Sequence, residues 1–243
     1  MALNGGIIGQ SSKAAFKTEI ATIKEQLEIE KANAKLGQEV FNSEELSDKL
    51  IPDRYKNVLA ITPNGELVLM NTPEGRAYIE LWGEVTIINT EEDLKNFRDE
   101  VNNGRTFGGE IVFLTSDINL NIAEEWEPIG KFCGKVESEE ANINVPFKGI
   151  FDGGGHEING MKIDSPESGR GFFGMAQDAT IMNLVIEENN IISSSGDVVG
   201  SVCAYADRSA VVGCTNKGDM CGSRGVGGIV RCRRKKVDNI KMR

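Results

Sequence analysis

Short apolar runs separated by glycines recur through the second half of the chain. In residues 146–163, PFKGIFDGGGHEINGMKI, three successive glycines stand between two apolar runs. Glycine adopts positive φ without a Cβ penalty, so this segment predicts a tight corner between two strands. Glycine-bounded apolar steps follow at 172–174, 198–200 and 226–228, and their last glycines are 26 and 28 residues apart. A repeat of this length predicts a solenoid.

The repeat also predicts which side chains fill the core and which glycines form the corner. We expect at least one of the glycines 153–155 to have positive φ, and we expect Gly169 to be exposed. A shift of one residue in the register would turn a core position toward solvent. The six positions expected to be buried are Ile181, Leu184, Ile186, Val199, Val202 and Val212.

Residues 10–36 have the periodicity of an amphipathic helix. Their apolar positions are spaced by four, three and four residues, and lysine and glutamate alternate on the other face. Ser11 or Ser12 is the predicted N-cap and Gly37 the predicted stop. The pattern favours a helix packed against the following domain, with a stalk or partner-binding helix as the alternative. The apolar stripe consists of Phe16, Ile20, Ile23 and Leu27.

Residues 38–109 are predicted to form a mixed α+β region. Pro63–Gly65 separates two β-rich runs, which is a strong hairpin signal. A short strand is expected at Val85–Ile88, followed by a helix over 90–103. Because the open end of a solenoid exposes unpaired strand edges, we expect this region to act as a cap. The helix has a capping-box pattern at Thr90 and Asp93 and an apolar face of Leu94, Phe97 and Val101.

The charge is distributed unevenly along the 243 residues. The net charge is −10, of which residues 231–243 contribute +6 and residues 1–230 contribute −16. An acidic body repels nucleic acid and anionic membranes, so neither is an expected partner. The basic segment 231–243 is expected to be disordered, because a strand cannot bury that many charges without partners. No apolar run is long enough to span a membrane.

The cysteines and the single histidine give little support for metal or redox chemistry. The five cysteines form no C-x-x-C pair, so a zinc site is not expected, and their odd number argues against a pure disulfide framework. Two of them, Cys203 and Cys214, are expected to fill small core positions. No cofactor is predicted. The other cysteines are Cys133, Cys221 and Cys232.

Candidate catalytic groups are few. His156 follows the glycine corner with no serine or cysteine nucleophile near it in sequence, so we expect it to hydrogen-bond locally. Four aspartates could line one face as in β-helix glycosidases, but they stand at predicted turns, where Asp is favoured for local hydrogen bonds. The acidic loop 137–142 lacks the ligand spacing of a calcium site. We predict no catalytic, cofactor-binding or metal-binding residue. The four aspartates are Asp152, Asp164, Asp178 and Asp197.

Two stretches resemble known families. Residues 4–10, NGGIIGQ, with the EIATIKEQLE stretch that follows, resemble the region after the membrane helix in type IV pilin-like surface proteins of Gram-positive bacteria. This resemblance implies a stalk or packing helix and a membrane anchor that this chain lacks. The order INTEEDLKNFRDEVNNG, IVFLTSDINL, WEPIG, PFKGIFDGGGHEINGMKI, GFFG and ATIMNLVIEEN, within residues 88–230, resembles bacterial surface proteins with GLUG motifs.

The second resemblance implies a parallel β-helix with inward apolar ladders, in a family that includes adhesins and non-catalytic arms. The pattern stops at Arg231, so a truncated solenoid is expected. The predicted fold class is therefore mainly β: an N-terminal helix (1–37), an α+β cap (38–109), a short parallel β-helix (110–230) and a basic tail (231–243).

The expected function is that of a non-catalytic, extracellular or cell-surface module for adhesion or ligand presentation. Its expected partner is a host, matrix or glycan ligand. The alternatives are a carbohydrate-active enzyme or carbohydrate-binding domain on the β-helix, and a phage tail-fibre fragment. The oligomeric state stays open.

Overall fold

The structure is a computed structural model that describes residues 10–37, 41–83, 85–132, 144–188, 190–195, 198–222 and 226–234. The chain divides into two compact units, Met1–Val85 and Thr86–Arg243. This division differs from the four segments expected from the sequence. The N-terminal helix shares a unit with the hairpin, and the helix predicted over 90–103 shares a unit with the solenoid.

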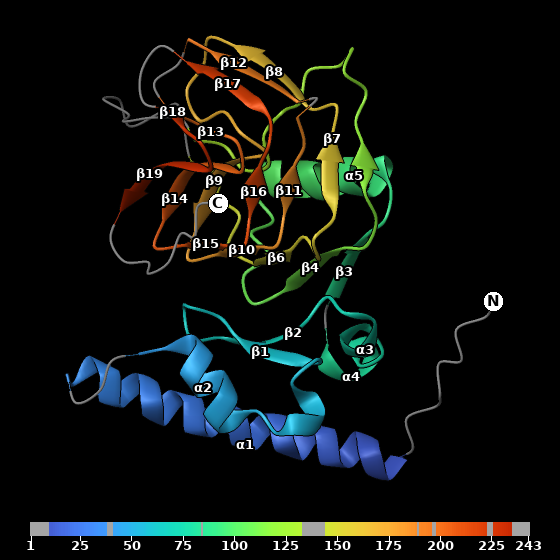
Figure 1. Ribbon diagram of the computed structural model, residues 1–243, viewed down its shortest axis with the longest axis vertical. Helices are drawn as coiled ribbons and strands as arrows, with labels where there is room; N and C mark the ends of the chain where they lie inside the picture. The colour runs from blue at the N-terminus through green and yellow to red at the C-terminus, as the bar shows by residue number, and fades with distance from the viewer. Residues whose placement is uncertain are drawn as a thin grey trace. The chain divides into compact units, whose positions relative to one another are not determined.

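The first unit contains one long helix, a hairpin and several short helices (Figure 1). The long helix has three buried positions on its predicted stripe, and the fourth, Ile20, is partly buried. The ring of Phe16 lies 5.2 Å from that of Tyr55 and 4.3 Å from that of Tyr78. The helix thus packs against its own unit, as favoured above. The elements are α1 (Gln10–Lys35), α2 (Ser43–Leu50), η1 (Asp53–Tyr55), β1 (Leu59–Ile61), β2 (Leu67–Leu69), α3 (Pro73–Arg76) and α4 (Ile79–Trp82).

The ends of α1 and the hairpin test three local predictions. Gly37 ends the helix with φ +71°, as predicted. The N-cap prediction is wrong, because α1 already begins at Gln10 and the two serines lie inside its first turn. Strands β1 and β2 pair antiparallel, with Leu59 opposite Leu69, and Gly65 in the turn has φ +78°. The hairpin prediction is therefore confirmed.

The second unit is a parallel β-solenoid (Figure 1). Figure 1 shows equivalent strands of successive coils side by side, with β7, β11 and β16 in one sheet and β8, β12 and β17 in another. The first coil contains β4 (Ile111–Leu114) and β5 (Ile118–Asn119). The second contains β6 (Ile150–Asp152), β7 (Glu157–Asn159), β8 (Lys162–Ser165) and β9 (Phe173–Gln177). The third contains β10 (Thr180–Met182), β11 (Val185–Ile186), β12 (Ile191–Ser194), β13 (Val199–Gly200) and β14 (Cys203–Asp207). The fourth contains β15 (Ala210–Val212), β16 (Thr215–Asn216), β17 (Asp219–Gly222), β18 (Val226–Gly227) and β19 (Val230–Arg234).

Parallel pairing aligns each coil with the next, so equivalent side chains form ladders. Ile181 pairs with Phe151 in one neighbouring coil and with Val211 in the other. Five of the six predicted core side chains are buried, and the sixth, Val212, is only partly buried. The ladder position belongs to Val211, because a shift of one residue along a strand moves a side chain to the other face.

The glycine repeat is real, but its alignment differs from the prediction. Arg170 pairs with Val199, and Val199 pairs with Val226. The equivalent glycines are therefore Gly171, Gly200 and Gly227, and Gly174 does not belong to this ladder. The doublet Phe172–Phe173 resembles Val198–Val199 in sequence, although the two stand at different places in their coils.

Two predictions about individual glycines have opposite outcomes. Gly154 and Gly155 have φ of +61° and +78°, which confirms the corner. A Cβ on Gly153 would lie 2.5 Å from the carbonyl oxygen of Asn183 in the next coil. The expectation that Gly169 is exposed is wrong, because it is buried with φ +77°.

A helix packs against the solenoid core, as the capping interpretation requires. After β3 (Val85–Ile88), the helix α5 (Glu91–Asn102) begins with the predicted capping box. Its three apolar side chains are all buried. The ring of Phe97 lies 5.7 Å from that of Phe147 and 6.0 Å from that of Phe151. The helix thus shares the apolar core of the solenoid.

The last strand corrects the prediction for the basic segment. Residues 230–234 form β19, which pairs with β14 through Cys203 opposite Val230 and Tyr205 opposite Cys232. Pairing of a strand depends on backbone hydrogen bonds, so it does not require its side chains to be buried. Residues 235–243 lie outside the described residues.

Two cysteines occupy the core as predicted. Cys203 and Cys214 are buried, and burial raises the pKa of each thiol to about 12. Cys221 is exposed.

Candidate functional site

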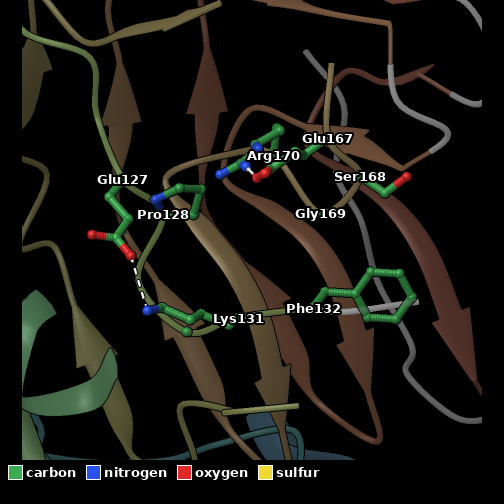
Figure 2. Close-up of a pocket in the computed structure, with 9 residues that line it drawn as sticks. Glu127, Pro128, Lys131, Phe132, Glu167, Ser168, Gly169 and Arg170 are labelled. Carbon is green, nitrogen blue, oxygen red and sulfur yellow. Dashed lines mark ion pairs between the residues drawn. The ribbon is translucent and has the colours of Figure 1, made fainter. Parts of the chain in front are cut away.

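A small hollow lies in the second unit between two segments of neighbouring coils. Its volume is about 220 Å³. One side is formed by residues 127–132, which continue the first coil, and the other by residues 167–170, which precede β9 (Figure 2). We call this hollow the Arg170 pocket. It is lined by Glu127, Pro128, Gly130, Lys131, Phe132, Glu167, Ser168, Gly169 and Arg170.

The first side of the pocket is held in place by α5 and by one glycine. The side chain of Asn102 donates a hydrogen bond to the carbonyl of Pro128 (3.0 Å) and accepts one from the N–H of Gly130 (2.8 Å). Gly130 has φ +76°, and a Cβ there would lie 2.6 Å from the carbonyl oxygen of Met175. Only glycine fits this position, because any larger residue would prevent the segment from lying this close to the backbone of Met175.

The tryptophan before this segment has a structural role. Trp126 is buried and stacks on Phe172, with ring centroids 5.6 Å apart. Its Nε1 donates to the carbonyl of Phe172 (3.2 Å). The indole is therefore not a sugar platform.

The second side of the pocket fits closely against Phe132. The N–H of Gly169 donates to the carbonyl of Val198 (2.8 Å), and a Cβ on Gly169 would lie 2.8 Å from the Cβ of Phe132. The ring of Phe132 stacks on Tyr205 at 4.5 Å with an interplanar angle of 14°. These contacts restrict the aromatic ring at the rim of the pocket.

Arg170 is the unusual residue of the pocket. It stands in the same ladder as Val199 and Val226, so two later coils carry valine where this coil carries arginine. Val199 is completely buried, and the side chain of Arg170 is only 15% exposed. A ladder position suited to an apolar side chain therefore holds a guanidinium.

The guanidinium of Arg170 is incompletely paired. Its Nη2 forms an ion pair with Glu167 (Figure 2). Its Nε is shielded from solvent and has no hydrogen-bond partner in the part of the chain that the structure describes. Burial lowers the pKa of Arg170, and the nearby carboxylates of Glu125 and Glu127 oppose that shift. Such an arrangement costs free energy, because buried donors are normally satisfied.

The other charged groups of the pocket are more exposed than Arg170. Lys131 Nζ lies 3.1 Å from Glu127 Oε1, and both side chains are about half exposed. Glu167 is 70% exposed. The pocket thus combines one embedded cation with a cation and two carboxylates that water can reach.

His156 does not belong to this pocket. Its Nδ1 lies 3.1 Å from Oδ1 of Asp117, which follows β4 in the first coil. The same oxygen accepts from the N–H of Glu157 (3.0 Å), and the two bonds lower the pKa of Asp117. The expectation of a sequence-local partner is wrong, because stacking brings the neighbouring coil nearer than neighbours in sequence.

The aspartates considered for catalysis are not gathered in one place. Asp152 is buried and accepts from the N–H of Gly154 (2.9 Å) and the side chain of Asn183 (3.0 Å). Asp164 is exposed in β8, in a different sheet. Asp152 thus stabilises the corner and links two coils, and the structure does not bring Asp164 together with it.

Of the other two aspartates, the structure describes only Asp178. Asp178 accepts from two nitrogens of Arg208 (2.7 and 2.8 Å), which lowers its pKa. Asp197 lies outside the described residues, as do Cys133 and the acidic loop 137–142. Among the residues that the structure describes, no three His, Cys, Asp or Glu side chains could hold a metal ion.

The Arg170 pocket was not predicted from the sequence. Had Gly171 been aligned with Gly200 and Gly227, the preceding positions would have read arginine, valine and valine. That exception within an apolar ladder was a visible signal. The contribution of residues 127–132 was not visible, because it depends on how the first coil stacks.

No family model, curated protein or solved structure matches this chain.

Proposed function

We propose that the solenoid is a non-catalytic module that acts outside the cell or at its surface and binds a polar group of a glycan or matrix ligand in the Arg170 pocket. The observation that carries this proposal is Arg170 itself, which stands in a ladder of valines. A guanidinium whose buried Nε has no partner among the described residues weakens the fold relative to an apolar side chain. Residues that lower stability in this way concentrate at functional sites.

The scaffold suits binding because both sides of the pocket are fixed. Asn102 holds the segment around Gly130, and Gly169 packs against Phe132. A preformed site loses little conformational entropy when the ligand arrives. The pocket can therefore bind through a few polar contacts.

The pairing of the pocket carboxylates favours binding over cleavage. A glycosidase needs a protonated carboxylic acid beside a second carboxylate. Each glutamate of the pocket is instead paired with a cation, Glu127 with Lys131 and Glu167 with Arg170.

The location outside the cell is supported by the two resemblances. The repeat order within residues 88–230 resembles that of GLUG-motif surface proteins, and the N-terminal segment resembles that of pilin-like proteins. Among the helices that the structure describes, none is both long and apolar enough to cross a bilayer. In this proposal α1 is a packing element of the first unit.

The test is a glycan array probed with the whole chain and two variants. Arg170→Val introduces the residue of the next two coils, so the variant is expected to fold and to lose binding. Arg208→Gln removes an exposed cation outside the pocket and should bind like the wild type.

Three results would contradict the proposal. They are the absence of any bound glycan, undiminished binding by Arg170→Val, and equal loss with Arg208→Gln. Shortening of the bound glycans, seen by mass spectrometry, would instead support the carbohydrate-active enzyme.

A further inference from the structure

The contacts of Arg170 also indicate which kind of group the pocket accepts. We propose that the ligand is an acidic sugar, a hexuronate residue, whose carboxylate takes the place of Glu167 on Arg170. This inference rests on the binding function proposed above. It adds the chemical class of the ligand.

The first argument is the unfilled edge of the guanidinium. A carboxylate can pair side-on with arginine through two parallel N–H···O bonds, one from Nε and one from an Nη. Glu167 pairs with Nη2, and Nε has no partner among the described residues. A ligand carboxylate that replaces Glu167 would pair with Nη2, and the displacement must also uncover the shielded Nε for the carboxylate to contact both nitrogens. A neutral hydroxyl forms no charged pair of this kind.

The second argument is that Glu167 can be displaced and Arg170 cannot. The Glu167 side chain is 70% exposed and lies three residues before its partner, so its ion pair is of the weak surface kind. The Arg170 side chain is 15% exposed and its backbone is fixed in the ladder with Val199. A ligand therefore competes with an exposed carboxylate for an embedded cation. Lys131, on the other side of the pocket, offers a second cation.

The third argument is the shape and lining of the pocket. Its volume of about 220 Å³ is below the roughly 300–1,000 Å³ of pockets for drug-sized ligands, so it suits a single ring. Pro128 and the ring of Phe132 supply apolar surface beside the charged groups. A pyranose has apolar C–H faces and polar edges, which matches this combination. A single carboxylate also fits the acidic body better than a dianion such as phosphate, because residues 1–230 carry −16.

The experiment is calorimetric titration of the full chain at low salt with three small probes. These are methyl β-D-glucuronide, its methyl ester and methyl β-D-glucoside, which share one ring and differ in the carboxylate. We expect the acid to bind at least about tenfold more tightly than the other two, because hydrogen bonds between charged groups are the stronger kind. Equal affinities, or no binding of the acid, would overturn the inference.

Two variants test the displacement of Glu167. Glu167→Gln removes the competing carboxylate, so we expect the acid to bind about three- to tenfold more tightly, with methyl glucoside unchanged. The matched control is Glu188→Gln, which removes the same charge from an exposed position that does not line the pocket. Weaker binding of the acid by Glu167→Gln, or the same gain in both variants, contradicts displacement.

Further arms separate this inference from the proposed function. Arg170→Lys keeps the charge without the side-on edge and should lose about tenfold in affinity for the acid. Methoxyacetate, a monocarboxylate without a ring, tests the sugar, and binding equal to that of the glucuronide would show that the sugar ring is not recognised. If Arg170→Val loses glycan binding but the acid is not preferred over its ester, the inference fails and the proposed function stands. If Arg170→Val keeps glycan binding, both fail.

Discussion

Arg170 and Val199 occupy the same ladder one coil apart, and their surroundings differ sharply. Val199 is fully buried in the apolar core, and its partner Val226 in the last coil is 40% exposed. Among the described residues, no strand of the first coil pairs with Arg170, and the segment 127–132 borders the hollow beside it. The same backbone position is thus buried in the core in one coil and lines the Arg170 pocket in another, where we propose that a ligand binds.

The difference concerns how regular the ladders of a repeat protein are. Stacked coils stabilise one another through apolar ladders, so most ladder positions have the same kind of side chain. A polar side chain can replace an apolar one in a ladder where the neighbouring coil leaves space for it. The comparison therefore distinguishes ladder positions that maintain the fold from the position that we propose for binding, and four experiments test that distinction.

The largest effect is expected at a core position. Leu184 is completely buried between coils, so Leu184→Ala should lower the free energy of unfolding by about 2–5 kcal/mol. The control Val212→Ala, at a partly buried position one residue off the ladder, should cost distinctly less. Urea unfolding of both variants measures the difference. Equal losses would mean that the register described here is wrong.

A smaller loss of stability is expected from substitution at the glycine corner. A Cβ on Gly153 would lie 2.5 Å from the carbonyl oxygen of Asn183 and 2.7 Å from the Cα of Leu184. These are backbone atoms that cannot rotate away, so Gly153→Ala should cost about 1–3 kcal/mol. Gly228→Ala, where no atom lies within 4 Å of the added Cβ, should change little. Equal tolerance of the two variants in urea unfolding would refute close stacking at the corner.

At the Arg170 position, substitution is expected to leave the free energy of unfolding unchanged or to raise it. Arg170→Val replaces a partly satisfied buried cation with the side chain of the next two coils. Its free energy of unfolding should stay unchanged or rise by about 1 kcal/mol, because apolar replacement of buried ion pairs is often neutral or stabilising. Thermal unfolding with Arg208→Gln as the control measures this. A loss of more than about 1 kcal/mol would make Arg170 a structural residue.

The smallest effect concerns the link between Asp117 and the second coil. The N–H of Glu157 and the ring of His156 lower the pKa of Asp117, so the folded state binds a proton there less readily than the unfolded state. This contribution is present above the unfolded pKa of about 4 and is lost as the pH falls through the lower folded pKa. Asp117→Asn should therefore be slightly less stable than the wild type at pH 7 and nearly equal to it near pH 2. Urea midpoints at both pH values test this, and an equal gap at both would exclude the linkage.

Several features could be predicted from the sequence because they depend on short segments. The capping box at Thr90, the stop at Gly37 and the hairpin turn at Gly65 are local choices of backbone conformation and were recognised correctly. The solenoid itself was predictable, since a repeat of apolar runs and glycines has few other ways to bury its apolar face.

The register and the candidate site were decided by contacts between coils. Val211 and Val212 are both valine, and only pairing with Ile181 and Met182 distinguishes the buried one. His156 contacts Asp117, which is 39 residues earlier in the chain. The Arg170 pocket needs residues 127–132 to approach 167–170, and strand β19 needs the edge of β14. The sequence determined the elements and the kind of fold, because these depend on local conformation and periodicity. The tertiary structure decided which side chains meet, because in a solenoid the nearest neighbour of a residue is usually one full coil away.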